Sequence, residues 1–373
     1  MMNKKLITHC TSCVMPATRP RITFHEGGIC NACLWAREKK SIIDWDARWK
    51  ELEGYADQLR NKGNGFDVIV PVSGGKDSCY VAYRMKHDLG LRPLLVHIEP
   101  PLPFELGNRN LDKLIAAGYD CIKVAPNPQV MRHIARREMI DFGDPLLCWM
   151  IPVRAVLFRI AIQFGVRWIM WGEDGEVEYG GLSHSKHNPI HDREYELRYL
   201  LSGNDPKKYL DEFTEDQLNF WLLPSQDEYE AAGIVNMHMN YFDAWDPYRN
   251  YIVAKEKFGL EEKEGRNIGT YTNFAQTDSA LFDLHCYLMY LKFGFGRCTA
   301  DACIDVRRGA LDRDQAVELI KKYDNAYPEP FIDMYLEYMQ MTLEEFGAAL
   351  DKHANKTLFQ KVDGRWTPLF EVF

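Results

Sequence analysis

Short apolar runs alternate with segments of helical periodicity between residues 66 and 171. The runs have the length and β-branched content of buried strands, and polar or glycine-rich residues separate them from the helical segments. Strands that alternate with helices form right-handed crossovers and a parallel sheet, and ligands bind at its carboxyl edge. The pattern predicts an α/β fold with strands at 66–72, 93–98, 121–125 and 167–171 and helices near 77–89, 107–117, 128–141 and 152–164.

The rest of the chain differs from this core in composition. Residues 34–63 carry an apolar stripe of helical spacing between charges, residues 182–250 are rich in polar and aromatic side chains, and 251–373 reads as mostly helical. We predict a cysteine module at 1–40, a helical linker at 41–63, the α/β domain at 64–181, and a mostly helical region for substrate binding and scaffolding at 182–373.

The first predicted strand runs into a glycine-containing loop and then a helix, in the sequence FDVIVPVSGGKDS. Unpaired N–H groups at a helix N-terminus attract phosphate, glycines let a ligand approach the backbone, and Lys76 adds positive charge. The spacing differs from a Walker loop. Six specified residues after a strand favour a phosphate site over an ordinary turn. We predict phosphate binding by Ser73, Gly74, Gly75, Lys76, Asp77 and Ser78, with Lys76 and Asp77 also acting in catalysis.

An acidic run, Gly172 to Glu178, follows the fourth predicted strand and should face the same crevice as the loop. Carboxylates there would hold Mg²⁺ against a leaving pyrophosphate. We expect Glu173 and Asp174 to be the metal-side pair, with Glu176 next and Asp174 also catalytic; a solvated acidic loop is the alternative, and for Glu178 it is equally favoured. Gly172 and, after the second strand, His97 are further predicted contacts of the nucleotide.

One arginine of the C-terminal region, Arg297, is a candidate phosphate ligand because glycines precede it and no acid is adjacent. The alternative is a helix-end charge paired with an acid such as Asp301. His184, His187 and His191 lie close together in the polar, aromatic stretch, which suits a sugar or nucleotide pocket better than a second metal site.

Four cysteines form two CxxC pairs near the N-terminus. Two such pairs supply four thiolates to one tetrahedral ion, and Gly27-Gly28 suits the turn of the second pair. We predict structural zinc on Cys10, Cys13, Cys30 and Cys33, with an iron–sulfur cluster as the alternative.

Composition limits the function classes. The net charge of −9 does not favour a broad nucleic-acid surface. No apolar run in the sequence suggests a membrane span or a secretion signal, and clustered cysteines favour metal over disulfides. We expect a cytoplasmic protein that does not act on membranes.

The ordered set of two CxxC pairs, SGGKDS, the run from Gly172 to Gly181 and the late Phe-Gly-Phe-Gly-Arg segment resembles the N-acetyl sugar amidotransferase family of the PP-loop ATP pyrophosphatases. The resemblance spans nearly the whole chain. It implies a PP-loop domain with ATP, Mg²⁺ and Zn²⁺ as cofactors. It also implies a C–N ligase reaction in lipopolysaccharide, O-antigen or flagellar glycan synthesis, which turns an N-acetyl group of a nucleotide-activated sugar into an acetamidino group and releases AMP and pyrophosphate.

The resemblance further implies a separate glutaminase subunit that supplies ammonia, since the sequence has no glutaminase motif. A tRNA-thiolating PP-loop enzyme is the alternative, in which Cys79, Cys121 or Cys148 would take part in catalysis. A third reading is a zinc-knuckle interaction module that carries an inactive nucleotide fold; the intact loop argues against it.

Overall fold

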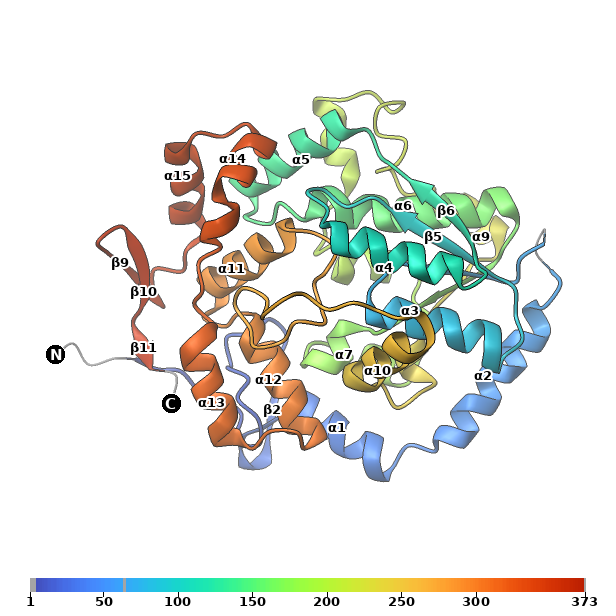
Figure 1. Cartoon of the computed structure of the whole chain (residues 1–373), viewed down its shortest axis with the longest axis horizontal. Helices are drawn as coiled ribbons and strands as arrows, with labels where there is room; N and C mark the ends of the chain where they lie inside the picture. Colours follow the sequence, from blue (N-terminus) through green and yellow to red (C-terminus); the bar gives the residue numbers. More distant parts are fainter. Residues whose placement is uncertain (1–4, 63–64, 372–373) are drawn as a thin grey trace.

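A parallel sheet of five strands lies at the centre of the computed structural model, which describes residues 5–62 and 65–371 (Figure 1). The strands follow the order β6-β5-β4-β7-β8 across the sheet, and each pairs in parallel with its neighbour. Their bounds are Val68–Pro71 (β4), Pro93–Ile98 (β5), Asp120–Val124 (β6), Trp168–Trp171 (β7) and Val235–His238 (β8). The expected α/β class is confirmed.

The chain reverses direction across the sheet at β4. From β4 it moves outward through β5 to β6, and it then returns to the other side of β4 to form β7 and β8. The crevice at such a switch point is where open α/β sheets bind ligands. The loops after β4 and β7, which hold most of the predicted site, therefore open into one crevice.

Four of the five strands lie within two residues of their predicted positions, but β8 was missed. It pairs along β7, with Trp168 opposite Val235 and Trp171 opposite His238. Its sequence, Val-Asn-Met-His, alternates apolar and polar residues, which is the period of a strand, and this signal was overlooked in a stretch interpreted as a polar, aromatic pocket. The sheet thus takes a strand from beyond residue 181. The predicted domain boundaries stay predictions, and the one at 63/64 lies outside the described residues.

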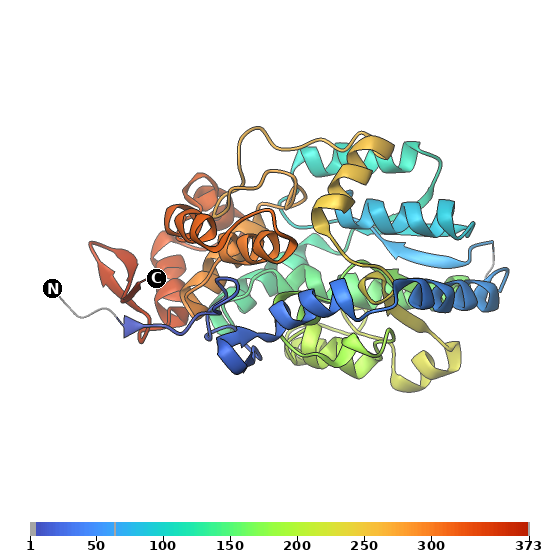
Figure 2. The same ribbon diagram turned by 90° about the horizontal axis from the view of Figure 1, so that it is seen from below.

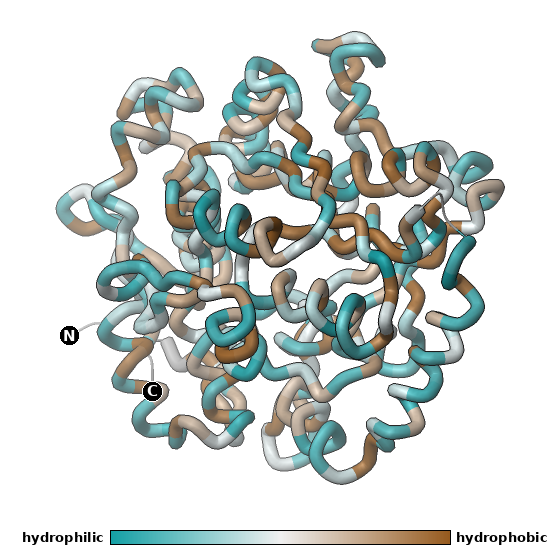
Figure 3. The backbone as a smooth tube through the Cα atoms, turned by 45° about the vertical axis from the view of Figure 1, so that its right-hand side comes forward, coloured by the Kyte–Doolittle hydropathy of each residue, from teal (hydrophilic) through white to brown (hydrophobic). Residues whose placement is uncertain are grey.

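Helices cover both faces of the sheet because successive strand residues point to opposite sides. Val68 and Val70 pack into one core with α2, α3 and α10, whereas Ile69 packs into the other with α5 and α6. Apolar segments run through the middle of the molecule (Figure 3). The helices are α2 (Trp45–Leu59), α3 (Lys76–Tyr83), α4 (Glu105–Ala116), α5 (Pro128–Asp141), α6 (Leu147–Phe164) and α10 (Pro247–Phe258).

Helix α6 begins five residues before its expected start and so becomes long and apolar enough to cross a membrane, by length and composition alone. This corrects the expectation from the sequence, which showed no such run. Inside the structure 67% of the helix is buried, and its apolar residues pack against the sheet. The buried core helix of a globular protein can be as long and as apolar as a membrane span, and the burial of α6 is typical of a core helix.

The C-terminal region is mostly helical and packs on the N-terminal segment. Figure 2 shows this segment beneath the C-terminal helices. Its cysteines share a core with Phe295, Ala302 and Val317, and β1 (Lys5–Leu6) pairs with β11 (Phe370–Glu371). The other helices and strands are β2 (Phe24–His25), β3 (Ile29–Cys30), α1 (Asn31–Ser41), α7 (Gly175–Tyr179), α8 (Arg193–Tyr195), α9 (Gln226–Ala232), α11 (Leu281–Phe293), α12 (Arg297–Arg308), α13 (Arg313–Tyr323), α14 (Ile332–Met339), α15 (Leu343–His353), β9 (Phe359–Val362) and β10 (Arg365–Pro368).

Candidate functional site

The loop between β4 and α3 requires a glycine at position 74. Gly74 has a φ of 81°, and a Cβ there would lie 2.5 Å from the backbone nitrogen of Leu111 on α4. The loop is therefore pressed against α4. Gly75 ends the loop as the N-cap of α3, and the Ser78 hydroxyl donates to the Gly75 carbonyl at 3.0 Å. The N–H groups at the start of α3 thus point into the crevice, as a phosphate site requires.

A cavity of about 190 Å³ opens at this loop, and we call it the phosphate-loop cavity. Two cationic side chains, Lys76 and Arg297, and three carboxylates line it. A polyanion would be repelled by the carboxylates unless a divalent cation accompanied it. The cavity is lined by Ser73, 75–78, Glu173, Tyr179, 274–278, Phe282 and Arg297.

Glu173 is the member of the acidic run that faces the cavity. Its Oε1 accepts from the Tyr179 hydroxyl at 3.1 Å and its Oε2 from the Trp245 indole nitrogen at 2.9 Å. Burial, with the nearby Asp77 carboxylate, raises the pKa of Glu173 to about 7. A half-buried carboxylate beside a second one is a typical partial site for Mg²⁺, which completes its octahedron with phosphate oxygens and water.

Asp174 points away from the cavity. It is fully buried and caps the short helix α7 (Gly175–Tyr179) by accepting from the Glu176 backbone N–H at 2.9 Å. It also accepts from the hydroxyls of Ser185 and Tyr195. Burial raises the pKa of its carboxyl. The structure therefore does not bring Asp174 together with Glu173, and its expected roles in Mg²⁺ binding and catalysis find no geometric support.

Glu176 and Glu178 face the N-terminal module instead. Arg21 donates from Nε to Glu176 at 2.8 Å, and the Leu182 N–H donates to the same carboxylate at 2.9 Å. Glu178 accepts from Trp35 at 2.9 Å and Lys39 at 2.6 Å, both on α1. The acidic run thus docks the cysteine module, and Glu176 has no described contact with the phosphate-loop cavity.

The other predicted nucleotide contacts lie near the loop without lining the cavity. His97 is buried on β5, and its Nδ1 lies 2.9 Å from the carbonyl of Val72, the residue just before the loop. It therefore holds the start of the loop in place. A Cβ at Gly172 would lie 3.1 Å from the Trp245 ring and 3.6 Å from the Asp77 Cβ. Gly172 therefore makes room for Trp245.

Arg297 lines the cavity together with Lys76, and the alternative considered for it, a pair with Asp301, is also present. Its Nε is 2.8 Å from Asp301 Oδ1, one helical turn further along α12. The sequence contains this pair at a spacing of four residues, which places two side chains on the same face of a helix. Arg297 is thus both held by an acid and exposed to the cavity.

Several residues of the site were not predicted individually. Asn250 on α10 donates to Asp77 Oδ1 at 2.9 Å, and Asp77 also pairs with Lys76. Residues 274–278 form one wall of the cavity. The Phe104 backbone N–H donates to the Asp278 carbonyl at 3.0 Å and so holds this segment in place. A polar turn before a long helix was the available signal at 269–274. Asn250 gave no local signal, because its partner lies 173 positions away.

A second cavity, of about 230 Å³, lies on the far side of Glu173, and we call it the seam cavity. It lies where α1 of the cysteine module meets α12 of the C-terminal region. Glu173 lines both cavities, so they share one wall. The seam cavity is lined by Ala32, Trp35, Ala36, Lys39, Lys40, Glu173, Glu178, 244–247, Ile304, Arg307 and Arg308.

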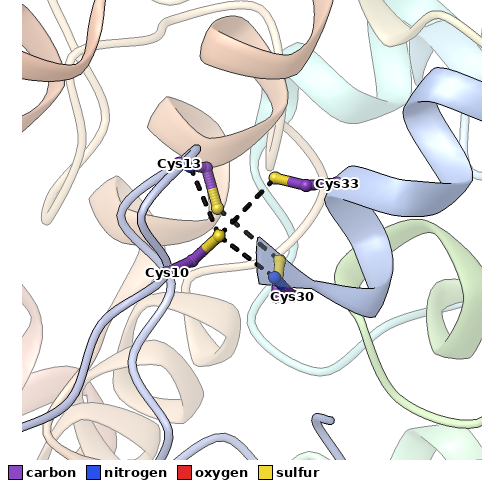
Figure 4. Close-up of side chains that lie close together, drawn as sticks. All are labelled: Cys10, Cys13, Cys30 and Cys33. Carbon is purple, nitrogen blue, oxygen red and sulfur yellow. Dashed lines mark hydrogen bonds between the residues drawn. The ribbon is translucent and has the colours of Figure 1, made fainter. Parts of the chain in front are cut away.

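The four predicted cysteine ligands converge (Figure 4). All four sulfurs are buried and lie within 4.8 Å of one another. Sγ of Cys10 is 3.9 Å from that of Cys33, and Sγ of Cys13 is 3.8 Å from that of Cys30. The Cys30 N–H donates to the Cys10 sulfur at 3.2 Å, which favours the thiolate. Gly27 and Gly28 have φ near 73°, as the predicted turn requires.

These distances fit one metal ion. Four sulfurs at about 2.3 Å from a tetrahedral Zn²⁺ lie about 3.8 Å apart. In a four-iron cluster each cysteine binds a different iron, so the sulfurs would be more widely spaced. The cysteine set therefore fits a metal, and its spacing is that of a mononuclear site. Arg307 contacts this cysteine site through the Cys13 sulfur. Its Nη2 also donates to the Glu178 carbonyl at 3.1 Å.

The cysteines considered for thiolation have poor properties for catalysis. Burial raises the pKa of Cys79 to about 12 and that of Cys121 to about 11. Burial also raises the pKa of Cys148, which has no exposed surface. Catalytic thiols need depressed pKa values and access to substrate.

The structure places neither His187 nor His191 in a group of metal ligands, and the side chain of His184 lies outside the described part of the chain. His191 is buried and lies 3.6 Å from Asp174, whereas His187 is exposed. The described residues contain one group of three or more potential ligands close enough to hold an ion, and it is the cysteine set.

Residues 268–371 match the family described as "LPS biosynthesis protein WbpG-like, C-terminal domain". The match agrees with the expected link to lipopolysaccharide synthesis. It covers α11 to α15 and does not extend to the phosphate loop or the cysteine module.

Other similarities are weaker. An uncharacterized protein of Methanocaldococcus jannaschii is 25% identical over 175 residues, which are 44% of this chain and 58% of that protein, so less than two thirds of this relative is spanned. A predicted subunit of tRNA methyltransferase from the same organism aligns with a TM-score of 0.26 at 13% identity over 51% of this chain and 75% of that chain. The U34-tRNA thiolase NcsA from Methanococcus maripaludis, with its 4Fe–4S cluster, aligns with a TM-score of 0.33 at 12% identity over 85% and 89%. Such values transfer no property to this chain.

Proposed function

We propose that the chain is an ATP-dependent amidotransferase that converts the N-acetyl group of a nucleotide-activated sugar into an acetamidino group in bacterial surface-polysaccharide synthesis. One observation carries the proposal: the phosphate-loop cavity and the seam cavity meet at Glu173. A reaction between ATP and a second substrate needs two adjacent sites. The match of residues 268–371 to a lipopolysaccharide biosynthesis family supports a sugar of this pathway class as the second substrate.

In the first half-reaction the amide oxygen of the acetamido group attacks the α-phosphorus of ATP. The bond between the α-phosphorus and the bridging oxygen breaks, and pyrophosphate leaves. The N–H groups of α3 and Lys76 would hold the pyrophosphate. Mg²⁺, which Asp77 and Glu173 would hold with phosphate oxygens, would neutralise developing charge.

In the second half-reaction ammonia attacks the imidate carbon and loses a proton. The carbon–oxygen bond breaks, and AMP leaves with the former amide oxygen. No covalent enzyme intermediate is needed, so the residues act by positioning and charge stabilisation. We propose that a separate glutaminase subunit delivers the ammonia, that zinc on the four cysteines is structural, and that the reaction is cytoplasmic, where ATP and nucleotide sugars are made.

The test is product analysis after incubation with ATP, Mg²⁺, an ammonium salt and a panel of UDP- and CMP-activated acetamido sugars. Mass spectrometry should show one sugar with NH in place of O, together with AMP and pyrophosphate. Lys76→Ala should abolish both products. Lys50→Ala, which removes an exposed lysine of α2, should retain them. AMP formation without a changed sugar would contradict the assignment of an acetamido sugar as the acceptor. Formation of ADP would contradict cleavage of ATP between its α- and β-phosphates.

A further inference from the structure

The seam cavity has the lining of a carbohydrate site. The indole N–H of Trp35 donates to Glu178 at 2.9 Å and that of Trp245 to Glu173 at 2.9 Å, so hydrogen bonds fix both rings. Fixed aromatic surface beside polar groups suits a sugar ring, which presents C–H bonds on its faces and hydroxyl or amide groups on its rim. Ala36 and Ile304 supply small and apolar surface on opposite walls.

The size of the cavity limits its occupant. Its volume of about 230 Å³ is below the roughly 300–1,000 Å³ of sites that enclose drug-sized ligands. A single pyranose fits such a volume, whereas an entire nucleotide sugar does not. The nucleotide part must therefore extend beyond the cavity.

The charges at the rim indicate where the phosphates lie. Lys39, Lys40, Arg307 and Arg308 line the cavity. Lys39 is neutralised by Glu178 and Arg308 by Asp305. In contrast, the Lys40 ammonium donates to a neutral group, the Arg307 carbonyl, at 2.9 Å, and Lys40 is exposed. Its charge is thus available to an anion at the mouth of the cavity.

We infer that the seam cavity binds the reacting sugar ring of a phosphate-bearing acceptor, with the acetamido group toward Glu173 and the phosphates toward Lys40. The inference rests on the proposed function for the identity of the reacting group. It also gives the cysteine module a role in substrate binding, because α1, which begins directly after Cys30, forms one wall.

Filling the cavity tests the inference. Ala36→Trp blocks it from α1, and Ile304→Trp blocks it independently from α12. Each should raise the acceptor KM by about tenfold or more, which corresponds to about 1.4 kcal/mol of binding free energy, while ATP affinity and bound metal stay at wild-type values. Arg37→Trp is the matched control, because it adds the same ring to the exposed residue next to Ala36. Wild-type acceptor kinetics in both blocked variants would overturn the inference.

A second variant tests the charge. Lys40→Gln should weaken binding of the activated sugar and leave binding of the free acetamido sugar unchanged, whereas Lys50→Gln should change neither. Calorimetric titration with the same activated sugars, without ATP, separates the two proposals. If an activated sugar binds wild type but not Ala36→Trp, and no amidine forms, the site stands and the proposed reaction falls. If amidine forms equally in wild type and both blocked variants, the reaction stands and the site falls.

Discussion

The indole nitrogen of Trp245 donates to Oε2 of Glu173 at 2.9 Å, at the point where the two cavities meet. Both residues line the seam cavity, and Glu173 alone of the two also lines the phosphate-loop cavity. Because Tyr179 holds the other carboxylate oxygen, the orientation of Glu173 is fixed before any substrate binds. Glu173 is therefore placed to contact a ligand in either cavity.

Glu173→Gln should raise the Mg²⁺ concentration needed for AMP formation by about tenfold or more, since the amide is a far weaker ligand than the carboxylate. In wild type the Mg²⁺ requirement should also rise as the pH falls below about 7, where the carboxyl with its raised pKa becomes protonated. Kinetics across pH 6 to 8 measure both effects. The exposed Glu215 provides the control, Glu215→Gln, and an unchanged Mg²⁺ requirement in Glu173→Gln would remove Glu173 from the metal site.

Cys10→Ser should lose the bound metal and destabilise the N-terminal module, because the binding energy of a structural metal is folding energy. Elemental analysis of the wild type should give one zinc per chain, in keeping with sulfur separations of 3.8 and 3.9 Å. Serine in place of the scattered, buried Cys286 serves as a comparison that keeps the metal. Several irons per chain would contradict the mononuclear assignment, and unchanged zinc in Cys10→Ser would contradict the ligand set.

Glu176→Gln should loosen the cysteine module from the rest of the protein. The change removes a charged acceptor from Arg21 and from the Leu182 N–H, and we expect a loss on the order of 2 kcal/mol in unfolding free energy. Limited proteolysis should then cut between the module and α2 sooner than in Glu215→Gln. Equal cleavage rates would mean that the acidic run does not dock the module.

Asp67→Asn should reveal a pH-dependent contribution to stability. Asp67 is buried, which raises its pKa, but the Arg92 guanidinium and backbone N–H groups of Asn61 and Arg92 outweigh burial and hold the pKa below its usual range. A depressed carboxyl pKa stabilises the fold above pH about 4 and loses this effect as pH falls through the folded value. The variant should be about 1–2 kcal/mol less stable at pH 7, since it loses the ion pair with Arg92. The loss is no larger because the Arg92 side chain is half exposed and solvent screens its charge.

Chemical denaturation of both proteins at pH 7 and near pH 3 measures the difference. The gap should close in acid. A gap that is constant with pH would show that Asp67 is not ionised in an ion pair with Arg92.

Local features of the site were predictable from the sequence, and relationships across the chain were not. The loop from Ser73 to Ser78 and the four cysteines follow from spacing alone, because each motif builds its own geometry. The acidic run shows the limit. Its carboxylates lie within six residues, but the turn at the start of α7 points them in different directions. Glu173 faces the cavity, Asp174 is buried as the cap of α7, and Glu176 contacts Arg21.

Position in the fold, rather than residue type, decides between these roles. Asn250 and Trp245 reach the site from beyond β8, a strand that was not predicted although its four residues alternate apolar and polar side chains. Arg297 is different, because its pair with Asp301 could be read from their helical spacing and was considered as the alternative.

The most direct test of the proposed reaction follows the oxygen atom of the acetamido group. An activated acetamido sugar labelled with oxygen-18 in the acetyl carbonyl is incubated with the enzyme, ATP, Mg²⁺ and ammonia. If the amide oxygen attacks the α-phosphorus, the label must appear in the phosphate of AMP, in an amount equal to the acetamidino sugar formed. Unlabelled AMP, or label released as water, would contradict adenylylation of the amide oxygen and with it the central claim.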